Sequence, residues 1–281
     1  MYNVVGISKQ AVNSYDRRNK SFINKLSLLI TEAEHLREEH PGCGVEKMYY
    51  VLQPSFLGRD KFIEIFMDIG FRVKRFKNYR RTTYSLAYRY PNLIKGLIVK
   101  RPCQVWQSDI TYIYANGDYY YAVFIIDVYT KKIVGYTISN HMRAEANIAA
   151  LKMALKTNKA PAIHHSDKGS QYGSNEYISL LKDNKCKISM CQTAQENAYA
   201  ERINRTIKEE YLDYWHPKTL KDLKKILVKA VDHYNEKRPH NHLERLPPVI
   251  FEQKWTNNTL ITKPEISIFN DNNDLESKPK Q

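Results

Sequence analysis

Residues 103–139 read CQVWQSDITYIYANGDYYYAVFIIDVYTKKIVGYTIS. Three stretches rich in β-branched and aromatic residues are separated there by two turns, one at Asn116 and Gly117 and one at residues 131–132. Short runs of this kind joined by tight turns are typical of neighbouring antiparallel strands. The segment therefore predicts that a sheet begins with three antiparallel strands.

The residues that follow alternate between helical and strand patterns. A helical spacing of apolar residues covers 143–157, and a short strand ends at Asp167. Further elements are expected at 174–183, 185–191, 197–212 and 219–237, the last with Thr219 as its N-cap. Strands first and then this alternation predict an α/β fold, with a mixed five-stranded sheet flanked by helices.

The charge of the chain points to a polyanionic partner. Lys and Arg number 44 against 30 Asp and Glu, which gives a formal net charge of +14. Each cation set against a phosphate releases a condensed counterion, so nucleic acid is the expected partner. Residues 69–108 hold ten Lys and Arg, Lys77, Arg80 and Arg81 among them, and no acidic residue. The aromatic rings interleaved there could stack on bases, and the alternative is a solvated linker.

A separate helical unit precedes the sheet. Apolar residues recur at helical spacing in 22–39, and two more helical patterns cover 45–53 and 58–71. Three short helices are typical of a helix-turn-helix-like domain, which can place its last helix in a major groove. The expected divisions are a helical DNA-binding domain, a basic linker, a core with the C-terminal helix, and a tail, at 1–91, 92–102, 103–255 and 256–281.

Several classes of protein are disfavoured by composition. No stretch approaches the roughly 18 apolar residues that a membrane span needs, and the N-terminal residues lack a basic segment followed by an apolar run. Four irregularly spaced cysteines do not suggest a disulfide framework. We therefore expect a cytoplasmic protein with reduced thiols and no membrane partner.

Three carboxylates lie where a reactive group would be expected. Asp109 interrupts an otherwise apolar strand, Asp167 directly follows another strand, and Glu201 lies on a helix. Each has an ordinary alternative: a strand-edge residue, a turn former, and an exposed helix charge paired with the residue one turn on. Together, on strand, loop and helix, they could converge, and hard oxygen ligands suit magnesium or manganese.

Other titratable residues on the strands are expected to be structural. Asp127, on the second strand, fits a structural role better than a catalytic one. His164 and His165 end a strand, where a satisfied core or surface histidine is more common than a ligand.

Four motifs carry a resemblance to a known family. They are WQSDITYI around Asp109, HHSDKGSQY around Asp167, ENAYAERINRTIKEEY around Glu201, and YNEKRPHNHL followed by a Pro-Pro pair. With these motifs the chain resembles the insertion-sequence transposases of the retroviral-integrase superfamily, specifically the second-frame product of elements that encode transposase in two overlapping frames. The resemblance covers nearly the whole chain and implies an RNase H-like fold.

The resemblance also implies the chemistry. It makes Asp109, Asp167 and Glu201 the triad that binds two Mg²⁺ ions, with Mn²⁺ as a possible substitute, and it suggests that Lys208 contacts the DNA end. The reaction implied is cleavage at element ends and transfer of a 3′-hydroxyl into target DNA. Between Asp167 and Glu201 lie 33 residues, two fewer than is common in the family. That shortfall makes Glu196 a competing candidate for the third ligand, although placement on the helix favours Glu201.

Basic residues beside the triad are expected to position the DNA. Arg202, Arg205 and Lys168 are expected to contact it, and the alternative is an ordinary helix surface. The resemblance also implies partners. A first-frame helix-turn-helix product is the expected partner, together with terminal inverted repeats, target DNA and further copies of this chain, associated with the bacterial nucleoid. Two alternatives stay open: a DNA-binding protein with an idle catalytic fold, and a structure-selective nuclease that cuts without joining strands.

Overall fold

The computed structural model describes residues 8–73, 90–191 and 193–268. The chain divides into two compact units, residues 1–74 and 75–281, which are described one at a time. Lys77, Arg80 and Arg81 lie outside the described residues. Within the described part of the chain, no helix is both long enough and apolar enough to cross a membrane.

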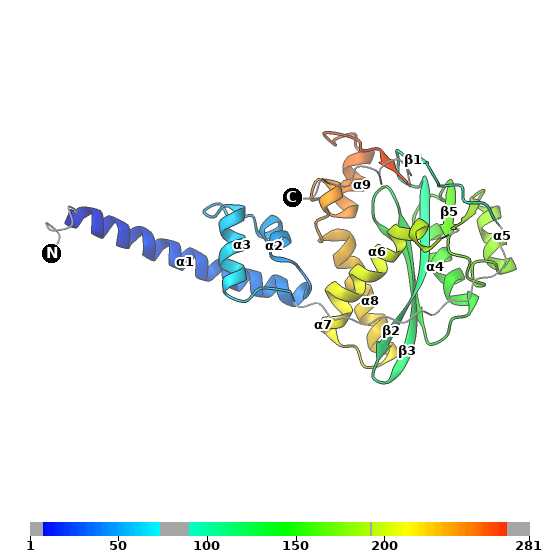
Figure 1. Cartoon of the computed structure of the whole chain (residues 1–281), viewed down its shortest axis with the longest axis horizontal. Coiled ribbons are helices and arrows are strands. Elements are labelled where there is room, and N and C mark those ends of the chain that lie inside the picture. The colour runs from blue at the N-terminus through cyan, green and yellow to red at the C-terminus, as the bar shows by residue number, and fades with distance from the viewer. Residues whose placement is uncertain (1–7, 74–89, 192, 269–281) are drawn as a thin grey trace, which may run out of the picture. The chain divides into compact units, whose positions relative to one another are not determined.

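The first unit is built from three helices (Figure 1): α1 Lys9–Glu39, α2 Val45–Leu52 and α3 Arg59–Asp68. They enclose a small core whose buried members are Leu29, Ala33, Cys43, Val45, Met48, Leu57, Phe62 and Phe66. The helices agree with the expected three, except that α1 begins thirteen residues earlier, after a Ser8 cap that accepts from the Ala11 amide at 3.1 Å. Its extra turns are mostly exposed, so no burial periodicity marks them in the sequence.

The second unit contains the mixed five-stranded sheet predicted from the sequence. Its strands are β2 Val105–Ala115, β3 Asp118–Asp127, β4 Ile133–Ser139, β5 Ile163–Ser166 and β6 Lys187–Met190. Their order across the sheet is β4-β3-β2-β5-β6. The pairs β2–β3 and β3–β4 are antiparallel, whereas β2–β5 and β5–β6 are parallel. This is the RNase H-like arrangement, in which the first strand of the sheet, here β2, is central and has a parallel neighbour, β5, on one side.

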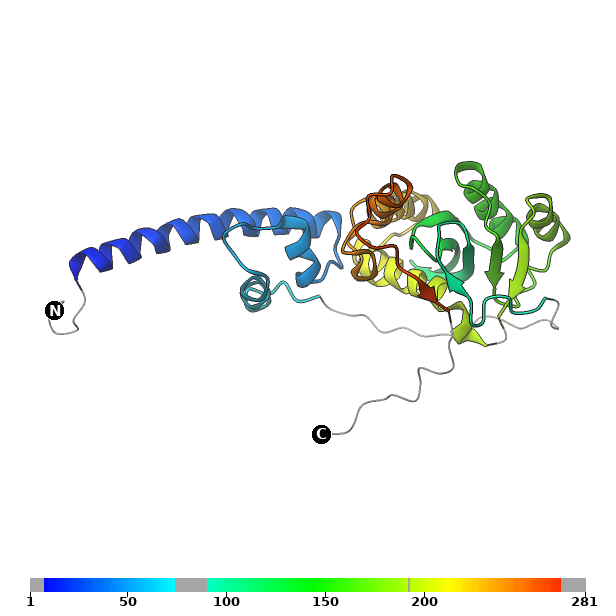
Figure 2. The same ribbon diagram turned by 90° about the horizontal axis from the view of Figure 1, so that it is seen from above.

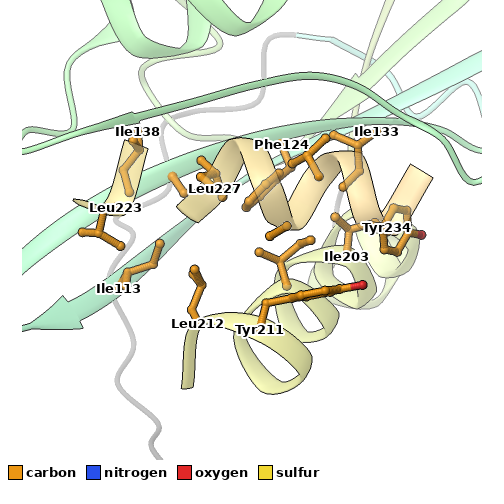
Figure 3. Close-up of a cluster of buried hydrophobic side chains, with 14 of the residues drawn as sticks. Ile113, Phe124, Ile133, Ile138, Ile203, Tyr211, Leu212, Leu223, Leu227 and Tyr234 are labelled. Carbon is orange, nitrogen blue, oxygen red and sulfur yellow. The ribbon is translucent and has the colours of Figure 1, made fainter. Parts of the chain in front are cut away.

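Helices cover both faces of this sheet (Figures 1 and 2). On one face lie α4 Ala144–Thr157 and α5 Asn175–Asp183, packed on a cluster that includes Val123 and Ile125. On the other lie α6 Ala198–Ile207, the π-helix η3 Lys208–Leu212, the short α7 Asp213–Trp215 and α8 Leu220–Glu236. Figure 3 shows Leu223 and Leu227 of α8 meeting Ile113 and Phe124 of the sheet. Because side chains alternate along a strand, neighbouring residues of β3 serve the two cores in turn.

The helix boundaries in this unit follow the sequence closely, with one omission. Thr219 caps α8, its hydroxyl accepting from the Asp222 amide at 3.1 Å, as expected. Two short 3₁₀ turns, η2 Ala194–Asn197 and η4 Asn241–Leu243, complete the loops. Helix α9 Pro248–Thr256 was not anticipated, because its apolar residues form no clear one-sided stripe and Pro247 and Pro248 suggest a loop.

The segments expected to be a linker and a tail pack on the second unit where the structure describes them. Strand β1 Ile98–Val99, in the expected linker, pairs with β7 Ile266–Ser267, in the expected tail. Ile94, Val99 and Ile268 are buried in one cluster with Phe251 of α9. Strands of two residues are too short for periodicity to reveal, and each depends on a partner far away in the chain.

Gly135 of β4 allows α4 to approach the sheet closely. A Cβ atom at this position would lie 2.3 Å from the Ala150 carbonyl oxygen and 2.9 Å from the Ala154 Cβ. The Ala150 oxygen belongs to the helix backbone, so Gly135→Ala is expected to force α4 away and to lower the free energy of unfolding by about 1–3 kcal/mol. Urea unfolding followed by tryptophan fluorescence measures this, since all three tryptophans lie in the second unit. An unchanged midpoint would contradict the close approach.

Candidate active site

The register of two parallel strands places Asp109 beside Asp167. Ser108 of β2 lies opposite Ser166 of β5. Asp109 directly follows the first serine and Asp167 directly follows the second. Adjacent strands lie about 4.8 Å apart, so two carboxylates one step beyond a paired position are neighbours. Gly169 donates its amide to Asp167 Oδ1 at 2.9 Å and so closes the turn after β5.

Burial and charge shift the pKa values of both aspartates. Burial first, and then the charge of Asp167, raise the pKa of Asp109 to about 8. The pKa of Asp167 is raised by burial and opposed by the Gly169 amide. A raised pKa means that the ionised form is disfavoured, so this half-buried place does not readily hold two adjacent anions. The site therefore has an excess of negative charge that a cation would relieve.

Glu201 lies in the first turn of α6, the helix that crosses the same region of β2. Although the residue is exposed as a whole, partial burial raises the pKa of its carboxylate, opposed by the charge of Arg205. The charge of Glu201 also contributes to the raised pKa of Asp109. The structure thus brings the three predicted carboxylates within electrostatic range. Among the described residues, however, no three His, Cys, Asp or Glu side chains are close enough to form a ready metal cage.

Lys208 follows Glu201 by seven residues and lies against the same strand. Its Nζ lies 4.5 Å from the centroid of the Tyr112 ring, a cation–π contact with β2. Burial lowers the pKa of Lys208, and the charges of Asp213 and Asp109 oppose this shift. The helix changes to π geometry at this residue, a feature often found at functional sites.

The chain is similar to integrase core domains and to proteins of bacterial insertion elements. Residues 99–195 match a protein family described as "Integrase core domain", and residues 183–248 match a second family with the same description. An uncharacterized 31 kDa protein of insertion element IS600 from Shigella sonnei is 31% identical over 91% of this chain and 98% of its own length. The transposase of IS904 from Lactococcus lactis is 32% identical over 64% of this chain and 72% of its own. The chain belongs to the insertion-sequence transposases with an integrase core domain.

Solved structures give a weaker likeness. The catalytic core domain of HTLV-2 integrase matches with a TM-score of 0.46 at 18% identity, and covers 57% of this chain and 99% of that one. The family consists of polynucleotidyl transferases of the DDE type, so this transposase is an enzyme that acts in DNA transposition and recombination.

Glu196, the competing third carboxylate of the transposase, has a different set of contacts. It closes a capping box with Thr193, in which the Thr193 amide donates to Glu196 Oε2 at 3.3 Å. Glu196 is buried and lies just before the first residue of α6. Burial lowers the pKa of His165 and the charge of Glu196 opposes this, whereas the charge of Glu201 adds to the raised pKa of Asp109.

The basic residues expected near the site of the transposase differ in their surroundings. Arg205 is exposed one turn after Glu201, and its charge opposes the rise that burial causes in the pKa of that carboxylate. Lys168 is half-buried in the turn after Asp167. The charge of Arg202 acts on Tyr234 of α8, which indicates that Arg202 lies toward α8.

Asn204 was missed by sequence reasoning. This buried residue of α6 donates its Nδ2 to Asp109 Oδ2 at 2.7 Å. Its Oδ1 is buried with no hydrogen-bond partner among the described residues. The available signal was spacing, because residues 201, 204 and 208 recur on one side of a helix.

The residues expected to be structural are confirmed as such by their contacts. Asp127 is buried and accepts from the Cys103 amide at 2.6 Å and the Thr130 amide at 2.8 Å. His164 pairs with the Tyr177 hydroxyl at 3.0 Å, and His165 with the Ser189 hydroxyl at 2.8 Å. Burial lowers the pKa of His164 to about 3 and that of His165 to about 4, so both are neutral core histidines.

The raised pKa of Asp109 predicts how stability depends on pH without metal. Because the folded carboxyl titrates near pH 8 rather than at its ordinary value, the folded state binds the proton more tightly, and stability falls as pH rises from about 4 to about 8. Asp109→Asn removes this loss. In metal-free buffer at pH 8 the variant is expected to exceed the wild type by about 1–3 kcal/mol. Thermal unfolding from pH 4 to 9 measures the difference, and a gain that does not shrink toward pH 4 would contradict the assignment.

Proposed function

We propose that this transposase cleaves insertion-sequence ends and transfers the freed 3′-hydroxyl into target DNA, using Asp109, Asp167 and Glu201. The observation that carries the proposal is the convergence of β2, β5 and α6. Strand register makes the two aspartates neighbours, and the charge of Glu201 acts on Asp109. The charges of Asp167 and Glu201 both disfavour ionisation of Asp109, and a bound cation would offset that cost.

The donor set fits divalent magnesium, with manganese as a substitute, and we propose two ions. The fit rests on carboxylates with raised pKa values and on the unpartnered oxygen of Asn204, all hard oxygen donors. When bound, a metal pair would activate water or a 3′-hydroxyl and stabilise the leaving oxygen. Asn204 would hold Asp109 Oδ2 in place, and Glu201 would approach from the first turn of α6.

We propose that cations around the triad position the DNA. Lys208, held on Tyr112, is the strongest candidate for a contact with the DNA end, and Arg205 and Lys168 flank the carboxylates. Contacts of this kind carry little sequence information but fix which phosphate is attacked. Arg202, and the residues Lys77, Arg80 and Arg81 outside the described part, stay proposals from sequence. The helical unit at the front is proposed to add DNA contacts.

The proposed partners are the terminal inverted repeats, target DNA, a first-frame helix-turn-helix product and further copies of the transposase. Synapsis of two DNA ends requires more than one active site near one another, which motivates the oligomer. The first-frame product would contribute recognition of the repeats.

The deciding experiment is a strand-transfer assay with purified transposase, the first-frame product, a labelled element end and Mg²⁺. Joined products that need the metal support the proposal. Metal-dependent cutting without joining would instead indicate a structure-selective nuclease. DNA binding without either product would indicate an idle catalytic fold.

A further inference from the structure

The start of α6 is tied to β2 by buried amide side chains that the triad itself does not include. Gln107 of β2 is fully buried and lies two residues before Asp109, so both side chains point to the same sheet face. Asn197, directly before α6, is also buried. Neither residue was singled out by the sequence.

Gln107 caps the helix that carries Glu201. Its Oε1 accepts from the Tyr199 amide at 3.1 Å and lies 3.4 Å from the Ala200 amide, which also donates to it. Amides in the first turn of a helix have no partner within that helix. The Nε2 of Gln107 donates to the Glu196 carbonyl at 3.3 Å. One side chain therefore binds the backbone on both sides of the helix start.

Asn197 holds the same junction from the helix side. As the N-cap of α6 it makes no capping hydrogen bond with its own side chain. Its Nδ2 donates instead to the Ser108 carbonyl at 2.9 Å, next to Asp109. The Ser108 hydroxyl pairs with the hydroxyl of Tyr172 at 2.9 Å, in the segment after Asp167. Residues 107–108 thus bridge β2, the segment after β5 and α6, which carry the three carboxylates.

We propose that Gln107 and Asn197 are positioning residues that fix the start of α6, and with it Glu201, relative to Asp109. The inference rests on the proposed triad, because it concerns the placement of the third carboxylate. Residues that orient a metal ligand typically change metal affinity by about 10–100-fold when they are replaced. Loss of the bridge is therefore expected to raise the Mg²⁺ concentration needed for half-maximal strand transfer by that factor.

A matched control lies three residues earlier. Gln104 also uses both ends of its amide on backbone groups: Oε1 accepts from the Lys100 amide at 2.8 Å, and Nε2 donates to the Ile98 carbonyl at 3.1 Å. Its contacts lie before β2 and not on α6. Gln104→Met, directly before β2, and Gln107→Met, within β2, thus remove the same amide chemistry from nearby positions, but only the second should loosen Glu201.

The test compares these two variants and Asn197→Ala by amide hydrogen exchange and by strand transfer over a range of Mg²⁺ concentrations. Gln107→Met is expected to speed exchange at Tyr199 and Ala200 and to raise the half-maximal Mg²⁺ concentration, whereas Gln104→Met should leave both at wild-type values. Unchanged exchange, or faster exchange without a change in Mg²⁺ dependence, would overturn the proposal.

Two safeguards separate the possible failures. Asn197→Ala removes a single hydrogen bond, so it supplies the answer if Gln107→Met does not fold. It is expected to shift the Mg²⁺ requirement in the same direction. If the wild type shows no metal-dependent joining, the triad proposal fails, while hydrogen exchange still reports whether Gln107 caps α6.

Discussion

Asp109→Asn is expected to abolish metal-dependent strand joining, with a loss of roughly 10³-fold or more, as for central catalytic groups in other enzymes. The amide keeps the size of the side chain but removes the negative charge that a divalent cation needs. Asp167→Asn and Glu201→Gln should have the same effect, because each removes one of the converging charges. Labelled element ends in Mg²⁺, resolved on a denaturing gel, measure nicked and joined products separately.

Glu196→Gln is the matched control for the third carboxylate. Glu196 is engaged in the capping box with Thr193, and the amide oxygen can still accept from the Thr193 amide. The variant should retain joining within about tenfold of the wild type, since it keeps the helix start. If Glu196→Gln abolished joining and Glu201→Gln did not, the assignment of the third ligand would be reversed. All variants should still bind the labelled end.

Arg238→Ala is expected to lower the free energy of unfolding by about 3–5 kcal/mol, a large effect for the replacement of one buried polar residue. Arg238 is buried after α8, and its guanidinium makes two bonds of 2.7 Å to Glu210 of η3. Removing the cation breaks both bonds to the Glu210 carboxylate, which is largely buried. Urea unfolding followed by tryptophan fluorescence gives the difference.

The exposed pair between Lys152 and Glu176, 3.1 Å apart, provides the comparison. Lys152→Ala should cost less than about 1 kcal/mol, because water screens such a pair. Arg238→Met combined with Glu210→Met should recover much of the loss of the single variant, because no uncompensated charge stays buried. A loss after Arg238→Ala no larger than that after Lys152→Ala would show that the buried pair does not hold η3 on α8.

These contacts explain a motif whose role the sequence did not reveal. YNEKRPHNHL supports the family resemblance, but no chemistry could be assigned to it. In the structure the Tyr234 hydroxyl donates to the Lys131 carbonyl at 3.1 Å, and Asn235 exchanges two hydrogen bonds with the backbone of Ile133 at 2.9 and 3.0 Å. With Arg238, the motif fastens α8 to the turn before β4 and to η3.

The sequence by itself determined the elements whose burial repeats locally. The β-branched and aromatic runs of β2 and β3, the stripe of α8 after Thr219 and the three helices of the first unit are all visible in it, because residue type and the 3.6-residue period of a buried helix face are local features. The carboxylates were also recognisable, since a charge within an apolar strand requires compensation.

Only the tertiary structure decided which distant groups meet. The register that sets Asp109 beside Asp167, the pairing of β1 with β7, the capping of α6 by Gln107 and the bond from Asn204 to Asp109 all join residues far apart in the chain. Such contacts produce no periodic pattern in the sequence. A polar side chain could bond with many different groups, and only the packing of the whole fold determines which group it meets.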